Sequence, residues 1–510
     1  MLKHNAGKML FSKGSSAMQS GKRFELKIPR CMSTQHPDNA SLPFFASSSV
    51  LFGEDEIREA YYAFSHLGCD EQMWDVEGKE IDTYVVKKLL SFYPEYFRNH
   101  TIGEDLRITL RAPNPTVERT EAKILLEILE SIPRSFDTAR LFYGCDTPPI
   151  FEVILPMTTS ARCIDRVYRY YTDHIIARQK VRFRNDDITI AEWIGDFLPT
   201  HIQVIPLFED VPTMLKADEI VAEYLSDKRI TDQRVFLARS DTAMNYGLVS
   251  AALANKIALA RLDALSNRIG VRLHPIIGMG SAPFRGGLSP QTAVRVGTEY
   301  PSVVTFTIQS AFKFDNPVEK VHTACEYLKT RQIGPATPID VERALSIIDR
   351  YSAAYRGLIP ALAPLINNIA KYVPKRRARK LHTGLFGYAR ELDGVALPRA
   401  ISFTCSLYSL GLPPELLALE SLSAEDFAFL KETYPSFCAK ISEALPYVDP
   451  SGPLMTDALR DALAAFGFDI APHPENLAIV RAIREALARG DSVSVSDLVL
   501  RAALLRRFLG

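Results

Sequence analysis

Short apolar runs alternate with amphipathic stretches through most of the chain. The apolar runs cover 106–112, 151–158, 203–209, 234–240, 271–277 and 303–307, and have the length and composition of buried parallel strands. Stretches with apolar residues at helical spacing cover 54–67, 81–97, 117–132, 161–179, 218–225 and 247–268. This alternation predicts an α/β protein in which a parallel sheet is joined by right-handed helical crossovers.

Two further runs complete the strand count. Residues 72–75 form a candidate first strand and residues 397–403 a candidate last one, which brings the total to eight. Eight strands fit a closed (β/α)8 barrel of the TIM type. The competing architecture is an open doubly wound sheet, but no glycine-rich dinucleotide turn follows an early strand. We therefore expect the closed barrel.

The pattern turns wholly helical from about residue 340, with long helical stretches at 340–369, 424–445, 476–489 and 495–508. No linker composition separates these stretches from the barrel. We expect residues 28–510 to form one domain, with the barrel reaching to about 405 and the helices elaborating it. Residues 1–27 place lysine and arginine among glycine and serine, which is typical of a flexible basic extension.

Composition excludes several classes of protein. The chain has 510 residues, 47% of them hydrophobic, and its 60 basic residues balance its 60 acidic ones. A large core is therefore expected, and a nucleic-acid partner is not, since that usually needs a concentrated basic face. Seven scattered cysteines without a CxxC motif indicate reduced thiols. The absence of a membrane-length apolar stretch or a signal peptide indicates a cytoplasmic protein with no membrane partner.

Two of the strand-like runs deliver a carboxylate at their ends, Glu209 and Asp241, with an amphipathic stretch at 216–229 between them. In a barrel both acids would lie at the carboxyl edge of the sheet. Hard divalent cations take oxygen ligands, and a protein often supplies only one or two of them. A metal site is one reading, and the alternative is that both acids cap turns or pair with arginines.

Arginines and glycines gather at other strand ends. Arg111 ends one strand-like run, Arg399 begins another, and Arg285 lies in the glycine-rich loop 278–287. Guanidinium groups bind carboxylate and phosphate in a bidentate way, although a single arginine of this kind is more often structural. The loop residues that would let the backbone approach a ligand closely are Gly278, Gly280, Ser281, Gly286 and Gly287.

Two more side chains are candidates for the site. His36 precedes Pro37, which favours extended backbone, and its imidazole is a natural proton carrier near neutral pH. The alternative is that His36 has only a structural role. Leu207 lies two residues before Glu209 and so on the same strand face, where it is either barrel core or an apolar wall of the site.

Together these segments resemble the archaeal-type phosphoenolpyruvate carboxylases, from about Ile28 to Gly510. The histidine segment is the most specific motif. The matching motifs are Met32-Ser33-Thr34-Gln35-His36-Pro37-Asp38-Asn39, Trp74-Asp75 with Glu77-Gly78-Lys79, Arg111 with Pro113-Asn114-Pro115, Pro206-Leu207-Phe208-Glu209, Ser240-Asp241, and Pro283-Phe284-Arg285-Gly286.

The resemblance implies an enzyme that carboxylates phosphoenolpyruvate with bicarbonate to give oxaloacetate and phosphate, an anaplerotic fixation of CO2. It implies passage through carboxyphosphate and a metal-bound pyruvate enolate, with Mg²⁺ or Mn²⁺ as cofactor and a homotetramer as the assembly. Residue by residue, it makes His36 the catalytic histidine and Glu209 and Asp241 the metal ligands. It makes Arg111, Arg285 and Arg399 the anion-binding arginines. Leu207 would wall a CO2 pocket, and the glycine loop would close over it.

The chain departs from the longer bacterial and plant enzymes at Ile277 and Met279, where those have a histidine and an arginine, and at Met244, where they have a lysine. The additional phosphate-binding group is therefore not determined, and the candidates are Arg239, Arg376, Arg377, Arg379 and Lys380. Two other functions also stay open. One is a metal-dependent pyruvate or oxaloacetate lyase or aldol-type enzyme, which would not need phosphate-binding arginines, and the other is an idle scaffold.

Overall fold

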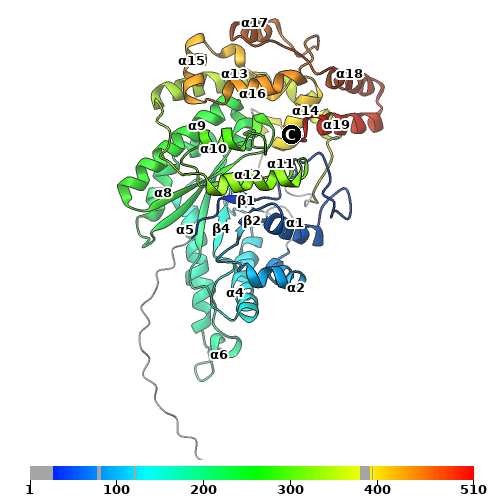
Figure 1. Cartoon of the computed structure of the whole chain (residues 1–510). Coiled ribbons are helices and arrows are strands. Elements are labelled where there is room, and N and C mark those ends of the chain that lie inside the picture. The colour runs from blue at the N-terminus through cyan, green and yellow to red at the C-terminus, as the bar shows by residue number, and fades with distance from the viewer. Residues whose placement is uncertain (1–26, 77–81, 120–121, 379–390, 393) are drawn as a thin grey trace, which may run out of the picture.

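Eight parallel strands form a closed barrel in the computed structural model, paired in sequence order with β1 completing the circle against β8 (Figure 1). The structure describes residues 27–76, 82–119, 122–378, 391–392 and 394–510. The strands are β1 (Cys31–Ser33), β2 (Glu71–Asp75), β3 (Arg107–Arg111), β4 (Glu152–Leu155), β5 (Gln203–Phe208), β6 (Asp232–Ala238), β7 (Arg272–Gly278) and β8 (Thr305–Ile308). The expected (β/α)8 barrel is confirmed.

The identity of two strands differs from the expectation. Residues 397–403 form no strand, because Ala400–Ser409 is the helix α14. The strand that completes the barrel is instead β1, whose three residues are all buried. So short a strand shows no periodicity, and the polar residues that follow it are typical of a loop. Residues 72–75 therefore lie in the second strand, and the last strand ends at residue 308 rather than near 405.

Helices surround the strands as the alternating pattern requires. They are α1 (Glu54–Ser65), α2 (Val85–Phe92), α3 (Pro94–Asn99), α4 (Ile124–Tyr143), α5 (Ala161–Arg169), α7 (Val211–Met214), α8 (Ala217–Leu225), α9 (Ser240–Ile269), α10 (Ala293–Glu299), α11 (Ser310–Phe314) and α12 (Val318–Thr330). After α5 the chain continues into a π-helical turn and the short α6 (Ile190–Ile194), which project from the body as an arm (Figure 1).

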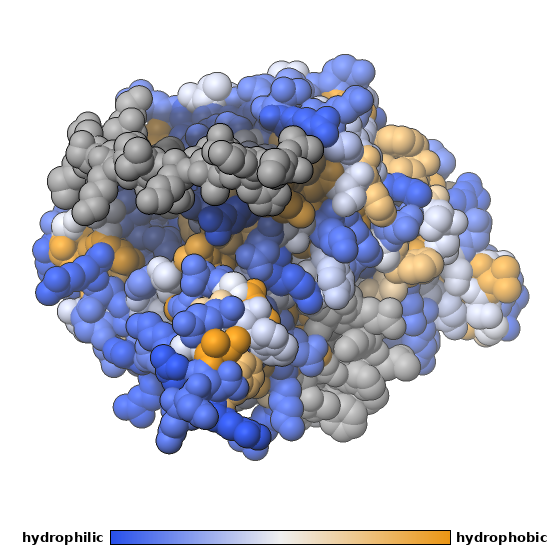
Figure 2. Space-filling view, turned by 90° about the horizontal axis from the view of Figure 1, so that it is seen from below, coloured by the Kyte–Doolittle hydropathy of each residue, from blue (hydrophilic) through white to orange (hydrophobic). Residues whose placement is uncertain are grey.

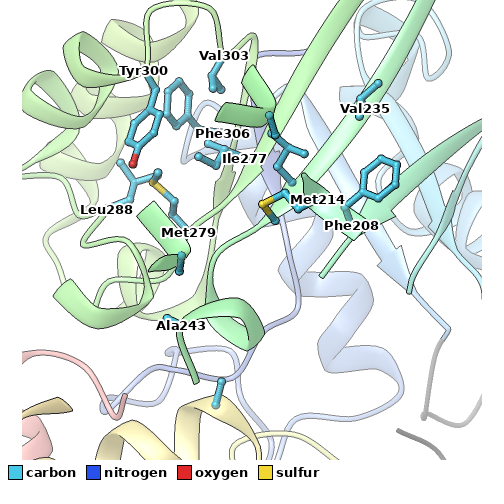
Figure 3. Close-up of a cluster of buried hydrophobic side chains, with 14 of the residues drawn as sticks. Phe208, Met214, Val235, Ala243, Ile277, Met279, Leu288, Tyr300, Val303 and Phe306 are labelled. Carbon is cyan, nitrogen blue, oxygen red and sulfur yellow. The ribbon is translucent and has the colours of Figure 1, made fainter. Parts of the chain in front are cut away.

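Side chains that point outward from the strands form the main core. Figure 3 shows Phe208, Val235, Ile277 and Phe306, one from each of four successive strands, within a cluster that also holds Met214 of α7 and Ala243 of α9. Their neighbours along the strands, such as Leu207, Phe236 and Ile276, belong to a second cluster that fills the barrel interior. This alternation follows from the two-residue period of a strand.

The C-terminal part of the chain is helical, as expected. Its helices are α13 (Val341–Ala370), α14 (Ala400–Ser409), α15 (Ala424–Thr433), α16 (Phe437–Ala444), α17 (Asp457–Ala465), α18 (Pro474–Arg489) and α19 (Ser492–Arg506), and they gather at one end of the barrel (Figure 1). The long α13 packs along α9, which is kinked at Gly247 with a φ of 83°. A Cβ atom there would lie 2.5 Å from Tyr351 and 2.9 Å from Tyr355 of α13, so only glycine fits.

A buried ionic layer fills the amino end of the barrel. Arg234 donates hydrogen bonds to Glu71 at 2.6–2.7 Å and to Glu152 at 3.0 Å, and Arg107 donates to Glu152 at 2.8 Å. Burial alone would raise the pKa of Glu152, but the charges of Arg234 and Arg107 outweigh it and hold the pKa below its ordinary value. The ionic layer and the apolar layer above it leave the carboxyl end for chemistry.

The surface is mostly hydrophilic on the face that carries the arm, with apolar residues in small separate patches (Figure 2). Over the described residues, no helix combines the length and apolar character needed to cross a bilayer. The expected basic extension at 1–27 lies outside the described residues except for Lys27, and so do Glu77, Gly78 and Lys79 of the second motif.

We predict that Arg234→Met lowers the free energy of unfolding by about 3–5 kcal/mol, because Glu71 and Glu152 would remain buried without their shared cation. Urea titration followed by circular dichroism measures the change. The matched control is Arg272→Met at the start of β7, where the arginine side chain is 60% exposed and pairs with Asp232. That surface variant is expected to cost no more than about 1 kcal/mol. Equal losses in both variants would contradict the importance of the buried layer.

Candidate active site

A cavity of about 690 Å³ lies at the carboxyl end of the barrel. Its walls come from the ends of strands β3, β5, β6 and β7 on one side and from the end of α13 and the start of α14 on the other. In barrels of this type the chemistry occurs at this end, and the volume suits small-molecule substrates.

The cavity brings together the residues that the sequence singled out. The predicted residues that line it are His36, Arg111, Leu207, Glu209, Asp241, Gly278, Arg285 and Arg399. Gly280, Ser281, Gly286 and Gly287 do not line it; Gly280 packs against Arg285, Gly286 against Met279, and Gly287 against Lys440 and Pro283.

Glu209 and Asp241 reach the cavity from neighbouring strands. Glu209 follows β5, and Asp241 lies in the first turn of α9 after β6, with both side chains half-buried. The main-chain N–H of Met157 donates to Glu209 Oε2 at 2.9 Å. Met157 has a φ of 47°, a conformation that is costly for a residue other than glycine, so backbone strain at the end of β4 aims this donor at the carboxylate.

The donor set fits one hard divalent cation. Two carboxylates that face the same cavity supply the oxygen ligands that Mg²⁺ or Mn²⁺ prefers, with substrate and water to complete the shell. Among the described residues, no group of three or more His, Cys, Asp or Glu side chains is arranged to hold a metal by itself.

Arg111 is held by a partner that the sequence did not identify as functional. Its Nε and Nη2 donate to the two carboxylate oxygens of Asp75 at 2.9 and 2.8 Å, and both side chains are buried. Asp75 ends β2 beside the end of β3, so strand pairing brings the two residues together. This bidentate pair fixes the plane of the guanidinium at the cavity wall.

Arg285 is one of the most buried side chains of the protein, at 1% exposure. Its Nε donates to Ser240 Oγ at 3.0 Å, Nη1 to Asp38 Oδ2 at 3.1 Å and Nη2 to Gln309 Oε1 at 2.6 Å. Nη1 also donates to the main-chain oxygen of Gly510 at 2.6 Å. Burial lowers the pKa of Arg285, and the charge of Asp38 opposes that shift.

The glycine-rich loop forms a packed turn in this structure. Its residues from Met279 to Leu288 are buried, the Gly280 N–H donates to the Arg285 carbonyl at 2.9 Å, and the Phe284 N–H donates to Glu415 Oε1 at 2.7 Å. The Arg285 guanidinium crosses directly over Gly280, where a Cβ atom would lie 2.6–2.7 Å from it. Gly280 therefore makes room for Arg285, and closure of the loop over the substrate stays a prediction.

His36 and Arg399 complete the cavity wall. His36 is half-buried, and its Nδ1 lies 2.9 Å from Thr34 Oγ1. Arg399 precedes α14 as its N-cap residue, so it is not at the end of a strand as the sequence indicated. A helix start directs it into the cavity from the side opposite the barrel.

Three of the arginines considered as phosphate ligands have structural partners. Arg239 is buried with its Nη atoms 3.3 and 3.5 Å from the Tyr300 and Tyr434 hydroxyls. Arg376 donates to the main-chain oxygens of Asn39 and Ala40, and Arg377 pairs with Glu56 and Glu59. Arg379 and Lys380 lie outside the described residues.

Sequence reasoning missed two basic residues of the cavity, Arg356 and Lys375. Arg356 lies within the regular amphipathic pattern of α13, where nothing marks it as functional. Only the packing of α13 over the barrel mouth brings it to the cavity, together with Tyr246, whose hydroxyl donates to Asp210 Oδ1 at 2.6 Å.

A sequence profile of the phosphoenolpyruvate carboxylase family matches residues 28–510. The phosphoenolpyruvate carboxylase of Methanospirillum hungatei is 54% identical over 485 residues, which cover 95% of this chain and 100% of that protein. The chain belongs to the phosphoenolpyruvate carboxylase family. Its enzymatic activity is that of phosphoenolpyruvate carboxylase, EC 4.1.1.31.

Other archaeal phosphoenolpyruvate carboxylases agree with this assignment. The enzyme of Methanothermobacter thermautotrophicus is 52% identical over 488 residues, covering 95% of this chain and 100% of that protein. The enzyme of Pyrococcus furiosus is 52% identical over 427 residues, covering 83% of this chain and 89% of that protein.

Among solved structures, an aldolase/citrate lyase family protein from Burkholderia cenocepacia aligns with a TM-score of 0.31 and 15% identity, covering 55% of this chain and 88% of that one.

We predict that Gly280→Ala lowers kcat/KM for phosphoenolpyruvate by about 10-fold or more, because the added Cβ must displace the Arg285 guanidinium. Steady-state kinetics measures the loss. Gly357→Ala in α13 is the control, since a Cβ there meets nothing within 4 Å and alanine suits a helix. Normal kinetics for Gly280→Ala would show that the position of Arg285 does not matter.

Proposed function

We propose that the chain carboxylates phosphoenolpyruvate with bicarbonate in the cavity at the barrel mouth, with the converging residues in separate roles. The observation that carries the proposal is that residues from distant parts of the sequence line one cavity, among them Glu209, Asp241, Arg111, Arg285, Arg399 and His36. An aldol-type or lyase reaction on pyruvate would not need three arginines there.

The first step joins two anions. A bicarbonate oxygen attacks the phosphorus of phosphoenolpyruvate, the bond from phosphorus to the enol oxygen breaks, and carboxyphosphate and the pyruvate enolate result. Arg111, Arg285 and Arg399 offset the repulsion between the reactants and orient their oxygens. Arg111 and Arg285 are already immobilised by Asp75 and Asp38, so little order has to be created when the substrates bind.

Glu209 and Asp241 are the residues that would hold Mg²⁺ or Mn²⁺. The cation would supply positive charge next to the oxygen on which the enolate's negative charge develops. The protein's own part is to hold the two carboxylates in place, which the Met157 N–H does for Glu209.

The second step needs a base and an apolar surface that excludes water. His36 removes the proton of carboxyphosphate, which then separates into CO2 and phosphate. The enolate carbon attacks CO2 and oxaloacetate forms. Leu207, which is 2% exposed, lines the cavity with Phe236 and Ala238 and gives CO2 an apolar surface that excludes water.

The experiment that tests the proposed reaction is an assay of oxaloacetate formation, coupled to NADH oxidation by malate dehydrogenase, with phosphate release measured in parallel. Both products are expected in equal amounts and only when bicarbonate is present. A reaction without phosphate release would favour the aldol-type alternative. The homotetrameric assembly and the cytoplasmic location stay predictions.

We predict that Asp241→Asn weakens Mn²⁺ binding by about 100-fold, because an amide replaces one of two anionic ligands. Electron paramagnetic resonance of free Mn²⁺ measures binding without turnover. Asp210→Asn is the matched control, because Asp210 lines the same cavity but accepts from the Tyr246 hydroxyl. Equal Mn²⁺ affinity in the wild type and in Asp241→Asn would remove the metal assignment.

We predict that His36→Asn still consumes phosphoenolpyruvate in a bicarbonate-dependent way but releases mainly pyruvate and phosphate. The arginines and the cation can still assemble the first step, whereas carboxyphosphate no longer delivers CO2 efficiently, so the enolate is protonated instead. Quantifying pyruvate and oxaloacetate side by side tests this. A normal oxaloacetate yield would sink the role of His36, and loss of all phosphate release would place His36 in the first step as well.

A further inference from the structure

A buried lysine lies beneath the segment that carries His36. Lys313 of α11 is 2% exposed, and its Nζ donates to Ser33 Oγ at 3.0 Å, to the Thr34 carbonyl at 2.9 Å and to Glu59 Oε1 at 2.8 Å. An ammonium group has three donors, and all three are used here. Lys313 therefore binds Ser33, the last residue of β1, and Thr34, which lies two residues before His36.

The charge of Lys313 is balanced by residues far away in the sequence. Glu59 of α1 also accepts from Arg377 Nη2 at 2.7 Å, and Arg377 Nη1 donates to Glu56 at 2.8 Å. Burial alone would raise the pKa of Glu59, but Arg377 and Lys313 outweigh it and bring the pKa to about 2. Two cations and two carboxylates thus belong to one buried hydrogen-bonded network.

Thr34 connects this network to His36. Its side chain is fully buried, its N–H donates to the Ile308 carbonyl at 3.1 Å, and its hydroxyl lies 2.9 Å from His36 Nδ1. For His36 to accept a proton at Nε2, its Nδ1 must carry the other proton and donate it to Thr34 Oγ1. The Thr34 hydroxyl can accept from Nδ1–H or donate to an unprotonated Nδ1, so its position fixes the orientation of the ring, and a ring that accepts at Nε2 needs the first of these two arrangements.

The same short helix holds the far side of the histidine. The Ser310 N–H donates to the His36 carbonyl at 3.3 Å, and the Ala311 N–H donates to Asp38 Oδ1 at 2.7 Å. Asp315, one residue past α11, accepts from the N–H groups of Ala40 and Ser41 at 2.7 and 2.6 Å. α11 and its end thus follow the segment from Thr34 to Ser41 closely, with Lys313 as the one cation among these contacts.

We propose that Lys313 is a positioning residue for His36, acting through Thr34 and held in charge balance by Glu59 and Arg377. This inference rests on the proposed role of His36 as the base. A buried ion pair is a weak source of stability compared with apolar packing, so its value here is the fixed geometry that it gives to Thr34. In this proposal Arg377, which the sequence suggested as a phosphate ligand, balances the charge of Glu59 and so holds Glu59 in place for Lys313.

The test uses the double variant Lys313→Met with Glu59→Gln, which removes one charge of each sign and leaves Arg377 paired with Glu56. We expect kcat to fall about 10-fold or more with KM for phosphoenolpyruvate within about twofold, and the pyruvate share of the product to rise. Lys228→Met is the matched control, because Lys228 is also ion-paired, to Asp165 and Asp227, but lies before β6 at the amino end of the barrel.

A second readout needs no turnover. Long-range ¹H–¹⁵N spectra of protein with labelled histidine, assigned by comparison with His36→Asn, report the tautomer of His36. The wild type and Lys228→Met should hold the proton on Nδ1, and the double variant should show a mixture of tautomers. An unchanged product ratio together with an unchanged tautomer in the double variant would overturn the proposal.

The outcomes separate this inference from the proposed function. A normal oxaloacetate yield from His36→Asn would refute the role of His36, while the tautomer measurement would still show whether Lys313 sets the ring. If the double variant does not fold, Thr34→Val removes the hydroxyl without leaving a buried charge. It should raise the pyruvate share of the product and give a mixture of His36 tautomers. Wild-type behaviour of Thr34→Val would then refute the proposal.

Discussion

Closure of the barrel is the constraint on which the rest of the structure depends. Eight parallel strands that pair in a circle must present all their carboxyl ends on one rim, whatever the distances between them along the chain. Arg111, Glu209 and Arg285 come from or follow different strands, and closure alone makes them neighbours. The side chains of each strand then only have to alternate correctly between the outer core and the barrel interior.

Charge inside the protein is organised in two places with different purposes. At the amino end, Arg234 and Arg107 fill the barrel together with Glu71 and Glu152, so two cations face two carboxylates within the core. At the rim, each arginine has a carboxylate partner and also lines the cavity: Asp75 fixes Arg111, and Asp38 fixes Arg285 together with Ser240, Gln309 and Gly510. The first arrangement serves folding, and the second prepares charged groups for ligands before any ligand arrives.

The sequence allowed the barrel and several charged residues of the cavity to be predicted, because buried strands are apolar runs and Glu209, Asp241 and Arg111 lie at the ends of such runs. The prediction failed where a strand is too short to show a period, or where two interacting residues lie far apart in the chain. β1 has three residues and no period, and 397–403 is apolar enough to pass for a strand although it starts a helix. Partners such as Lys313 and Glu59 are 254 positions apart, so no local pattern shows that they meet. In the basic run at 375–380, Arg376 and Arg377 line the cavity and are also hydrogen-bonded to residues of the 39–59 segment, partners that no local pattern shows.

The kink at Gly247 separates the first turn of α9, which carries Asp241, from the long remainder of that helix, and the Tyr351 and Tyr355 rings occupy the space that any side chain would need. Gly247 does not line the cavity, yet every replacement must either straighten the helix or push α13 away from the barrel mouth. In a saturation scan scored by growth, this position would therefore tolerate as few residues as the proposed metal ligands, and intolerance to substitution alone would misassign it to the chemistry.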